Sequence, residues 1–228
     1  MLTAIAIVPS APVMVPELAG AAAAEVADLR AAAVTAASSL PARWVAIGVA
    51  ATDAVIGPDA VGTFAGYGVD VPIRLSDAAA SPPAALPLCA LIAGWVRGLV
   101  APSATVDVRA YAEHTAPATA VATGRALRTE LDAARDAVGA LIVADGANTL
   151  TPSAPGGHDP SFVPVQAALD DALRLADLAV LAALPDGIVG RVAYQVLAGL
   201  AAPAPRSAEQ LYRGAPYGVG YAVGLWTP

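Results

Sequence analysis

The chain has 228 residues, 57% of them hydrophobic, a mean hydropathy of +0.63 and a formal net charge of −7. This charge disfavours nucleic acid as a partner, because phosphate backbones are bound by clustered basic side chains. All twelve basic residues are arginine, so Schiff-base chemistry and a P-loop lysine are excluded. The single cysteine, Cys89, excludes an intramolecular disulfide and a multi-cysteine metal site.

The apolar segments are too short to cross a membrane. The best candidates are Leu86–Val96 and Leu178–Leu184, and no window of about eighteen residues is free of charge, Pro or Gly. No basic segment precedes the first apolar stretch, which prolines interrupt from Pro9 onward, so no secretory signal is predicted. We therefore expect a cytoplasmic protein with no membrane partner, folded as a single domain over residues 1–228.

In the first half of the chain, apolar runs and breakers alternate. Thr3–Val8 predicts a buried strand, and the Ala-rich Glu17–Ser39 predicts a helix that ends before Pro41. The continuous apolar run Trp44–Ala50 is typical of a strand covered on both faces. Val71–Leu75 predicts an edge strand, and Leu86–Val100 predicts a buried helix that contains Cys89. In such a run, a buried thiol is the expected state of the cysteine.

The second half continues the alternation of strands and helices. Thr105–Tyr111 alternates apolar and polar residues, as a half-covered strand does. Pro117–Val138 predicts an amphipathic helix, and Leu141–Ala144 predicts the next strand. The remaining predictions are two helices, Pro164–Leu175 and Leu184–Val196, and a final strand around Val219–Val223. Strands that alternate with helices in this way predict an α/β fold with a largely parallel sheet.

The stretch Val143–Pro160, VADGANTLTPSAPGGHDP, is the best candidate for a functional site. It follows a predicted buried strand and holds Asp145, the only asparagine (Asn148) and His158, one of two histidines. Open α/β folds bind ligands at the carboxyl ends of their strands. Asp145 is therefore a candidate for acid or base work, although its carboxylate can also simply cap the turn at Gly146–Thr149.

Other chemistries find little support in the sequence. No G-x-S-x-G motif is present, so Ser10 and Ser153 are weak candidates for a nucleophile. A metal site of two histidines and one carboxylate would need His114 and His158 to meet an acid. The acid could be Glu113, Asp53 or Asp145. The simpler interpretation is that both histidines are ordinary strand-end and loop residues.

Three motifs together resemble the LigB-like superfamily of class III extradiol ring-cleavage dioxygenases, which has relatives linked to Memo-like proteins. Pro9–Glu17, PSAPVMVPE, resembles the N-terminal proline-rich run of that family. Asp145–Pro160 resembles its central loop, and Pro216–Val223, PYGVGYAV, resembles its terminal strand. The resemblance implies a three-layer α/β/α fold with a mixed, largely parallel central sheet, and it implies an iron site.

The family's metal histidines are missing from this chain. Ser10 stands where the first histidine is expected, Asn148 stands at the histidine of the central loop, and the stretch after Trp44–Val49 offers only Asp53. Serine and asparagine are poor iron ligands compared with imidazole. The resemblance therefore implies a pocket without bound metal or other cofactor, built from Ser10, Asp53, Asp145, Asn148 and His158.

Two hypotheses on function follow. The first is a non-catalytic or accessory protein with the LigB fold that binds a small molecule and has lost the iron ligands. The second is a surviving enzyme, either a ring-cleavage dioxygenase or a metal-independent enzyme, with a relocated site around Asp145, Asn148 and His158. The resemblance also implies a homo-oligomer or a protein partner, whereas the sequence identifies neither the ligand nor the contact surface.

Overall fold

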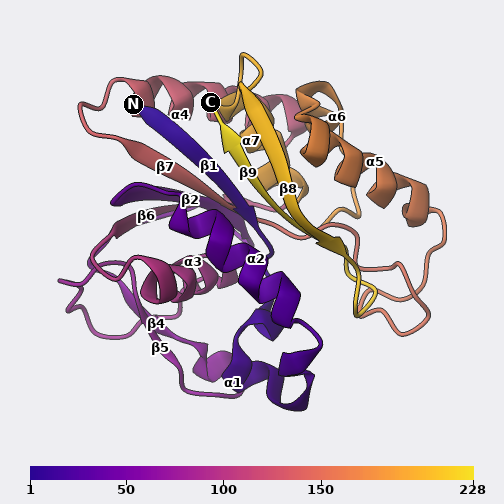
Figure 1. Cartoon of the computed structure of the whole chain (residues 1–228), viewed down its shortest axis with the longest axis horizontal. Helices are drawn as coiled ribbons and strands as arrows, with labels where there is room; N and C mark the ends of the chain where they lie inside the picture. The colour runs from indigo at the N-terminus through magenta and orange to yellow at the C-terminus, as the bar shows by residue number, and fades with distance from the viewer.

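The computed structural model describes residues 1–228 and is built on a seven-stranded mixed sheet in the order β3-β6-β2-β7-β1-β9-β8 (Figure 1). The four central strands β6, β2, β7 and β1 are parallel, β3 and β9 run antiparallel to their central neighbours, and β8 runs antiparallel to β9. The strands of this sheet are β1 (Leu2–Val8), β2 (Arg43–Ala50), β3 (Ala54–Ile56), β6 (Thr105–Ala112), β7 (Val138–Val143), β8 (Ser207–Gly214) and β9 (Tyr221–Thr227).

Helices cover both faces of the sheet and create two hydrophobic cores (Figure 1). On one face, α2 (Ala27–Ser38) and α3 (Leu88–Val100) bury Trp44 and the apolar side chains around it. On the other face, α4 (Pro117–Asp132), α5 (Phe162–Leu175), α6 (Leu178–Ala182) and α7 (Arg191–Leu200) pack around Tyr194 and Trp226. The predicted fold class, α/β with three layers and a largely parallel sheet, is confirmed.

The central strands are apolar because both of their faces are covered. All six residues of β7 are buried, and β7 lies between β1 and β2, with Ile142 opposite Ile7 on one side and Ile47 on the other. The predicted strands Thr3–Val8, Trp44–Ala50 and Thr105–Tyr111 are confirmed to within one residue at each end. This arrangement brings Val8, Ala50, Ala112 and Val143, the last residues of four parallel strands, to one edge of the sheet.

Three of the predicted helices had wrong boundaries. The helix predicted at Glu17–Ser39 is interrupted, because Gly20 has a φ of +54° and separates α1 (Pro16–Ala19) from the 3₁₀ segment η2 (Gly20–Ala24) and from α2. The helix predicted at Pro117–Val138 ends at Asp132, since Val138 already belongs to β7. The helix predicted at Leu184–Val196 begins only at Arg191, after Gly187 at a φ of +95°.

The region around the edge of the sheet also departs from prediction. The edge strand predicted at Val71–Leu75 is β5 (Pro72–Arg74), which pairs with β4 (Val61–Thr63) in a separate two-stranded sheet. Neither edge strand of the main sheet, β3 or β8, was predicted as a strand. None of the residues of β8 is fully buried, so its sequence lacks the pattern of a covered strand. Two short 3₁₀ segments, η1 (Pro12–Met14) and η3 (Phe64–Tyr67), complete the fold.

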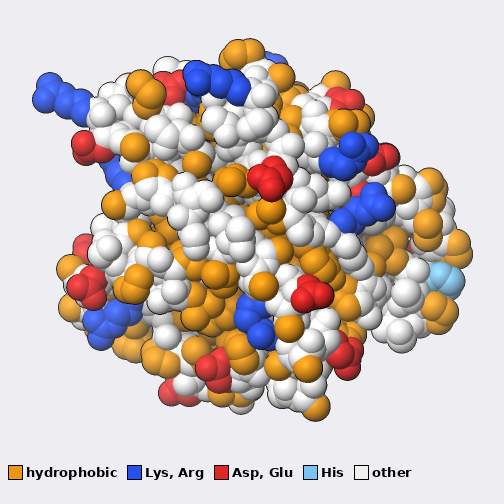
Figure 2. Space-filling view, in the orientation of Figure 1, with side chains coloured by type: hydrophobic (Ala, Val, Ile, Leu, Met, Phe, Trp, Pro, Cys, Tyr) orange, Lys and Arg blue, Asp and Glu red, His pale blue; other side chains and the backbone are white.

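Acidic and basic side chains are mixed on the surface, and five ion pairs join some of them. In Figure 2 acidic and basic side chains lie scattered over the visible face, with hydrophobic side chains between them. Such a surface agrees with the modest net charge of −7. None of the helices is both long enough and apolar enough to span a bilayer.

Candidate functional site

A cavity of about 250 Å³ opens at the carboxyl ends of the parallel strands. Its polar side chains come from three strand ends: Ser10 beyond β1, Glu113 beyond β6 and Asp145 beyond β7. Its walls are mostly apolar and include Val49 of β2 and Leu88 at the start of α3. Ligands bind at this edge of open α/β sheets because the loops there are free to carry polar groups on a rigid frame.

Asp145 is the most unusual side chain in the cavity. It is only 9% exposed, and the backbone N–H of Ser10 donates a hydrogen bond of 2.8 Å to its Oδ1. None of the five ion pairs in the structure involves Asp145. Burial raises the pKa of the Asp145 carboxyl to about 7, and the Ser10 N–H offsets only part of that rise. Near neutral pH this carboxyl is therefore divided between its protonated and ionised forms.

The second oxygen of Asp145 stays open to the cavity. Oδ2 accepts no hydrogen bond from the protein, since Ser10 is the only donor to this carboxyl. The side-chain polar atoms that are both fully enclosed and unpaired belong to other residues, namely Arg109, Thr149 and Gln210. Oδ2 thus has no hydrogen-bond partner in the protein and is not fully enclosed, so it can accept a hydrogen bond from a molecule in the cavity.

The backbone beside Asp145 is held firmly in place. The Gly190 N–H donates to the Asp145 carbonyl at 2.8 Å, and the Tyr194 hydroxyl donates to the Ala144 carbonyl at 3.0 Å. A Cβ at position 190 would lie 2.5 Å from the Ala144 Cβ, so only glycine fits where α7 approaches the end of β7. These contacts clamp the start of α7 against the strand that carries Asp145.

Gln166 of α5 fixes the residues that follow Asp145. Its Oε1 accepts from the Ala147 N–H at 2.8 Å, and its Nε2 donates to Oδ1 of Asp170 at 2.8 Å. A Cβ on Gly146 or Gly220 would come within 2.1 to 2.3 Å of the Gln166 amide, so these two glycines make the slot in which that amide lies. We did not predict this role. Its sequence signal is a glutamine on the apolar face of a helix, in register with Leu169 and Leu173.

Two of the five predicted pocket residues, Ser10 and Asp145, line the cavity, whereas Asp53, Asn148 and His158 do not. The Asp53 carboxylate accepts from the Ala112 N–H at 2.7 Å and so ties the turn after β2 to the end of β6. It therefore stabilises the rim of the sheet instead of reaching the cavity.

Asn148 and His158 lie in a loop that closes on itself. The Asn148 carbonyl accepts from the Gly156 N–H at 2.9 Å, and the Asn148 side chain packs so closely on Gly156 that a Cβ there would lie 2.4 Å from its Oδ1. His158 is exposed beside Asp159, whose carboxylate accepts hydrogen bonds from Ser161. The structure thus gathers neither residue with Asp145.

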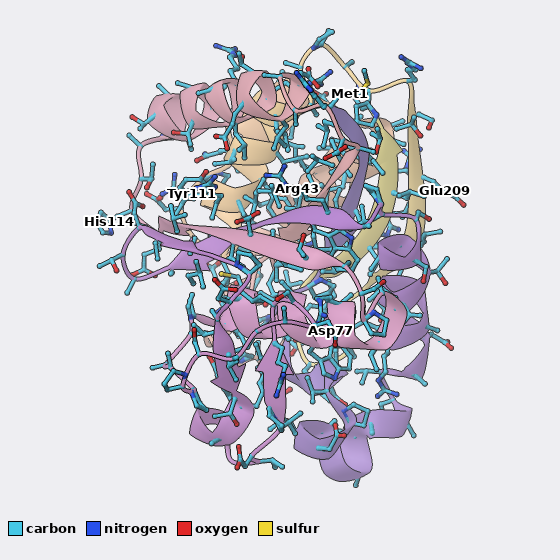
Figure 3. All side chains as sticks on the ribbon, turned by 90° about the vertical axis from the view of Figure 1, so that its left-hand side faces the viewer. Met1, Arg43, Asp77, Tyr111, His114 and Glu209 are labelled. Carbon is cyan, nitrogen blue, oxygen red and sulfur yellow. The ribbon has the colours of Figure 1, made fainter.

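The donor set at the strand ends does not fit an iron ion. His114 is exposed in the turn after β6, and Figure 3 shows it at the periphery of the molecule. No three side chains among His, Cys, Asp and Glu lie close enough to share a metal ion. Cys89 is buried as expected, and burial raises the pKa of its thiol to about 11, so it is not an activated ligand or nucleophile.

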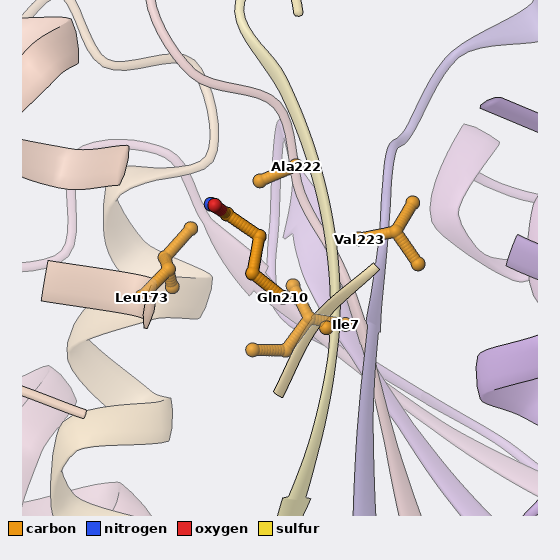
Figure 4. Close-up of a pocket in the computed structure, with 6 residues that line it drawn as sticks. Ile7, Leu173, Gln210, Ala222 and Val223 are labelled. Atoms are coloured by element: carbon orange, nitrogen blue, oxygen red, sulfur yellow. The ribbon is translucent and has the colours of Figure 1, made fainter. Parts of the chain in front are cut away.

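The other hollows differ from this cavity in size or in shape. Figure 4 shows a cavity between Leu173, Gln210 and Ile7 of only about 10 Å³, which is room for one water molecule. A wider groove of about 380 Å³ runs between α5 and the end of β8, where Arg213 lies 3.9 Å from Asp170. The Asp145 cavity differs from this groove in two respects: it lies at the carboxyl ends of the parallel strands, and its buried carboxyl has no arginine beside it.

Comparison with known proteins defines the fold and goes no further. No family model matches the chain, and no curated protein matches it. Among the solved structures similar to it is the crystal structure of the uncharacterized protein JW3007 from Escherichia coli K12, with a TM-score of 0.57 and 11% sequence identity. The match covers 99% of this chain and 100% of that one. The chain therefore shares an α/β architecture with that protein over its whole length.

Proposed function

We propose that this chain is a small-molecule-binding protein with a LigB-like fold, that its ligand site is the cavity at Asp145, and that it does not perform iron-dependent ring cleavage. The observation that carries the proposal is the open Oδ2 of a 9% exposed carboxyl in a largely apolar cavity. A buried polar group without a partner is costly, so such a group is usually satisfied by a ligand or by water.

The contacts around Asp145 favour binding over catalysis. Catalytic nucleophiles and bases occur as mutually hydrogen-bonded groups, and neither Ser10 nor Glu113 makes a side-chain hydrogen bond to a base. The Tyr194 hydroxyl donates to a backbone carbonyl, not to Asp145. Of the three residues of the relocated enzyme site, Asp145, Asn148 and His158, only Asp145 lines the cavity.

A binding screen with a plugged cavity tests the proposal. We would screen a library of single-ring fragments by ligand-observed NMR against the wild-type protein, Ala51→Trp and Ala31→Trp. Ala51 lines the cavity, so tryptophan there should fill it. Ala31 is exposed on α2 and serves as the matched control. We expect some fragments to bind the wild type and Ala31→Trp but not Ala51→Trp. The absence of binders, or binders indifferent to Ala51→Trp, would refute the proposal.

The metal content and activity of the purified protein test the proposal that the chain does not perform iron-dependent ring cleavage. We expect no stoichiometric iron or zinc by elemental analysis, because the cavity offers two carboxylates and a serine but no imidazole. With ferrous iron and catechols we expect no yellow ring-cleaved product. One tightly bound metal ion per chain would contradict a metal-free site, and turnover of a catechol would establish the dioxygenase alternative instead.

A further inference from the structure

We infer that the ligand of the Asp145 cavity is a small organic amine whose ammonium group pairs with Oδ2 of Asp145. This inference rests on the proposed binding function and names the class of molecule that the cavity selects. It follows from the charges that line the cavity, from the contacts that hold the nearby Arg191 away from Asp145, and from the size of the apolar space.

Both ionisable side chains that line the cavity are acids. Asp145 lies at its floor, Glu113 is exposed at its rim, and no arginine or histidine joins them. The pKa of Asp145 is raised because the ionised carboxylate lacks both water and a countercharge. A ligand ammonium would supply that countercharge and a hydrogen-bond donor together, which makes it a stronger partner than a neutral hydroxyl.

Arg191, which directly follows Gly190 at the cavity wall, is occupied elsewhere. Its guanidinium donates to the carbonyls of Glu113 and Thr115 at 3.0 and 3.2 Å and to Oε1 of Gln195 at 3.1 Å. Its Nε also lies 3.2 Å from Asp186. The side chain is only 9% exposed in this arrangement, so it is fixed and does not serve as the cation for Asp145.

The remaining polar groups around Asp145 do not reverse the sign of the charge. Tyr194 of α7 and Tyr221 of β9 are close enough that the Asp145 charge raises their pKa values further, so both hydroxyls stay neutral. The first turns of α3 and α7 contribute partial positive charge, about half a unit each. At pH 8, above the Asp145 pKa of about 7, the two carboxylates exceed that contribution, and the cavity therefore favours a cation.

The dimensions of the cavity restrict the amine to a small one. About 250 Å³ is less than most drug-sized pockets occupy, so it suits one ring with a short arm. Val49, Leu88 and Val189 supply the apolar wall against which a ring can pack. A monocyclic amine satisfies the buried acid and the apolar wall simultaneously.

Three ligands that share one ring separate charge from shape. We would titrate benzylamine, benzyl alcohol and benzoate into the wild-type protein at pH 8 by NMR or calorimetry. We expect benzylamine to bind at least about tenfold more tightly than benzyl alcohol, and benzoate to bind most weakly. Lowering the pH to 6 should weaken benzylamine and leave benzyl alcohol unchanged, because Asp145 takes up a proton in this range.

Variants locate the effect and separate the two proposals. Asp145→Asn should abolish the preference for benzylamine and keep benzyl alcohol binding, Glu113→Gln should reduce the preference less, and the exposed Asp77→Asn should leave it intact. Equal binding of benzylamine and benzyl alcohol would overturn the inference and leave the binding function standing. The inference would also be overturned, with the binding function left standing, if none of the three ligands binds but neutral or anionic fragments bind the wild type and not Ala51→Trp. If no fragment binds at all, the binding function itself fails.

Discussion

Asp145 and Asp170 are two carboxylates with the same exposure, 9%, and very different surroundings. Gln166 donates to Oδ1 of Asp170 at 2.8 Å, and the Arg213 guanidinium lies 3.9 Å from its Oδ2. Asp145 receives only the Ser10 N–H and has no cation beside it. Burial raises the pKa of both carboxyls, and for Asp170 the contacts with Gln166 and Arg213 counteract the rise.

The contrast separates a structural carboxylate from one that is available to a ligand. Asp170 completes a chain of hydrogen bonds that runs through Gln166 to the Ala147 N–H and so holds the loop after β7. Asp145, two residues before Ala147, sits on the same loop with one oxygen open to the cavity. Asp170 and Gln166 thus make the site rigid, and Asp145 supplies the carboxyl oxygen that is available to a ligand. Preorganised binding sites require such rigid support.

The largest expected effect is on the pH dependence of stability. The folded-state pKa of Asp145 lies above its ordinary value of 3.8, so its favourable contribution is complete below about pH 4 and is lost as the pH rises through about 7. Across that window the unfolding free energy of the wild type should fall, relative to Asp145→Asn, by up to about 4 kcal/mol. Urea unfolding at several pH values measures the difference.

Asp170→Asn is the matched control for that measurement. Gln166 and Arg213 counteract part of the rise that burial causes in the pKa of Asp170. Asp170→Asn should therefore change the pH dependence of the unfolding free energy less than Asp145→Asn does. If the curves of the wild type and Asp145→Asn run parallel between pH 4 and 8, the contrast between the two acids is wrong.

The next effect is on the link between the two acids. In Gly146→Ala the new Cβ would lie only 2.1 Å from Oε1 of Gln166. This clash should displace the Gln166 side-chain amide from its hydrogen bond with the Ala147 N–H. We expect a loss of about 3 kcal/mol in unfolding free energy, typical of overpacking with the loss of a buried hydrogen bond. Gly57→Ala, which meets no atom within 4 Å, should change stability by less than about 1 kcal/mol. Similar values for both variants would argue against a rigid Gln166 slot.

The smallest effect should come from the cation beside Asp170. The Arg213 side chain is 53% exposed and its Nε lies 3.9 Å from the carboxylate, so the pair is largely screened by solvent. Arg213→Ala should reduce stability by about 0.5 kcal/mol. A loss several times larger, measured by the same urea titration, would mean that the arginine and not Gln166 compensates Asp170.

Much of the fold could be predicted because the apolar patterns of its strands are clear in the sequence. The apolar run of β2 and the alternation in β6 identify covered and half-covered strands, and both lie within a residue of the predicted ranges. The break in the first helix could not be placed, because the φ of +54° at Gly20 depends on how the chain packs and not on local propensity. Strand β8 was missed since an edge strand has no consistently buried face.

The candidate site was predictable only where it depends on strand ends. Ser10 and Asp145 reach the cavity because each lies two residues beyond the end of a central parallel strand. Asn148 and His158 are close to Asp145 in sequence, but turns that link Gly156 to Asn148 and Asp159 to Thr149 fold this loop upon itself. Glu113 directly follows the parallel strand β6, so the same rule accounts for its place at the cavity. Gln166 acts from the distant helix α5, and its role could not be deduced from local spacing.

The ionisation of Asp145 tests the account most directly. The carboxyl ¹³C shift of this residue, assigned by comparison with Asp145→Asn, would be followed from pH 3 to 9 with and without saturating benzylamine. We predict a pKa close to 7 in the free protein and a clear decrease when the amine binds. A pKa near 4 in the free protein would contradict the claim that Asp145 is a buried, unpaired carboxyl kept open for a ligand.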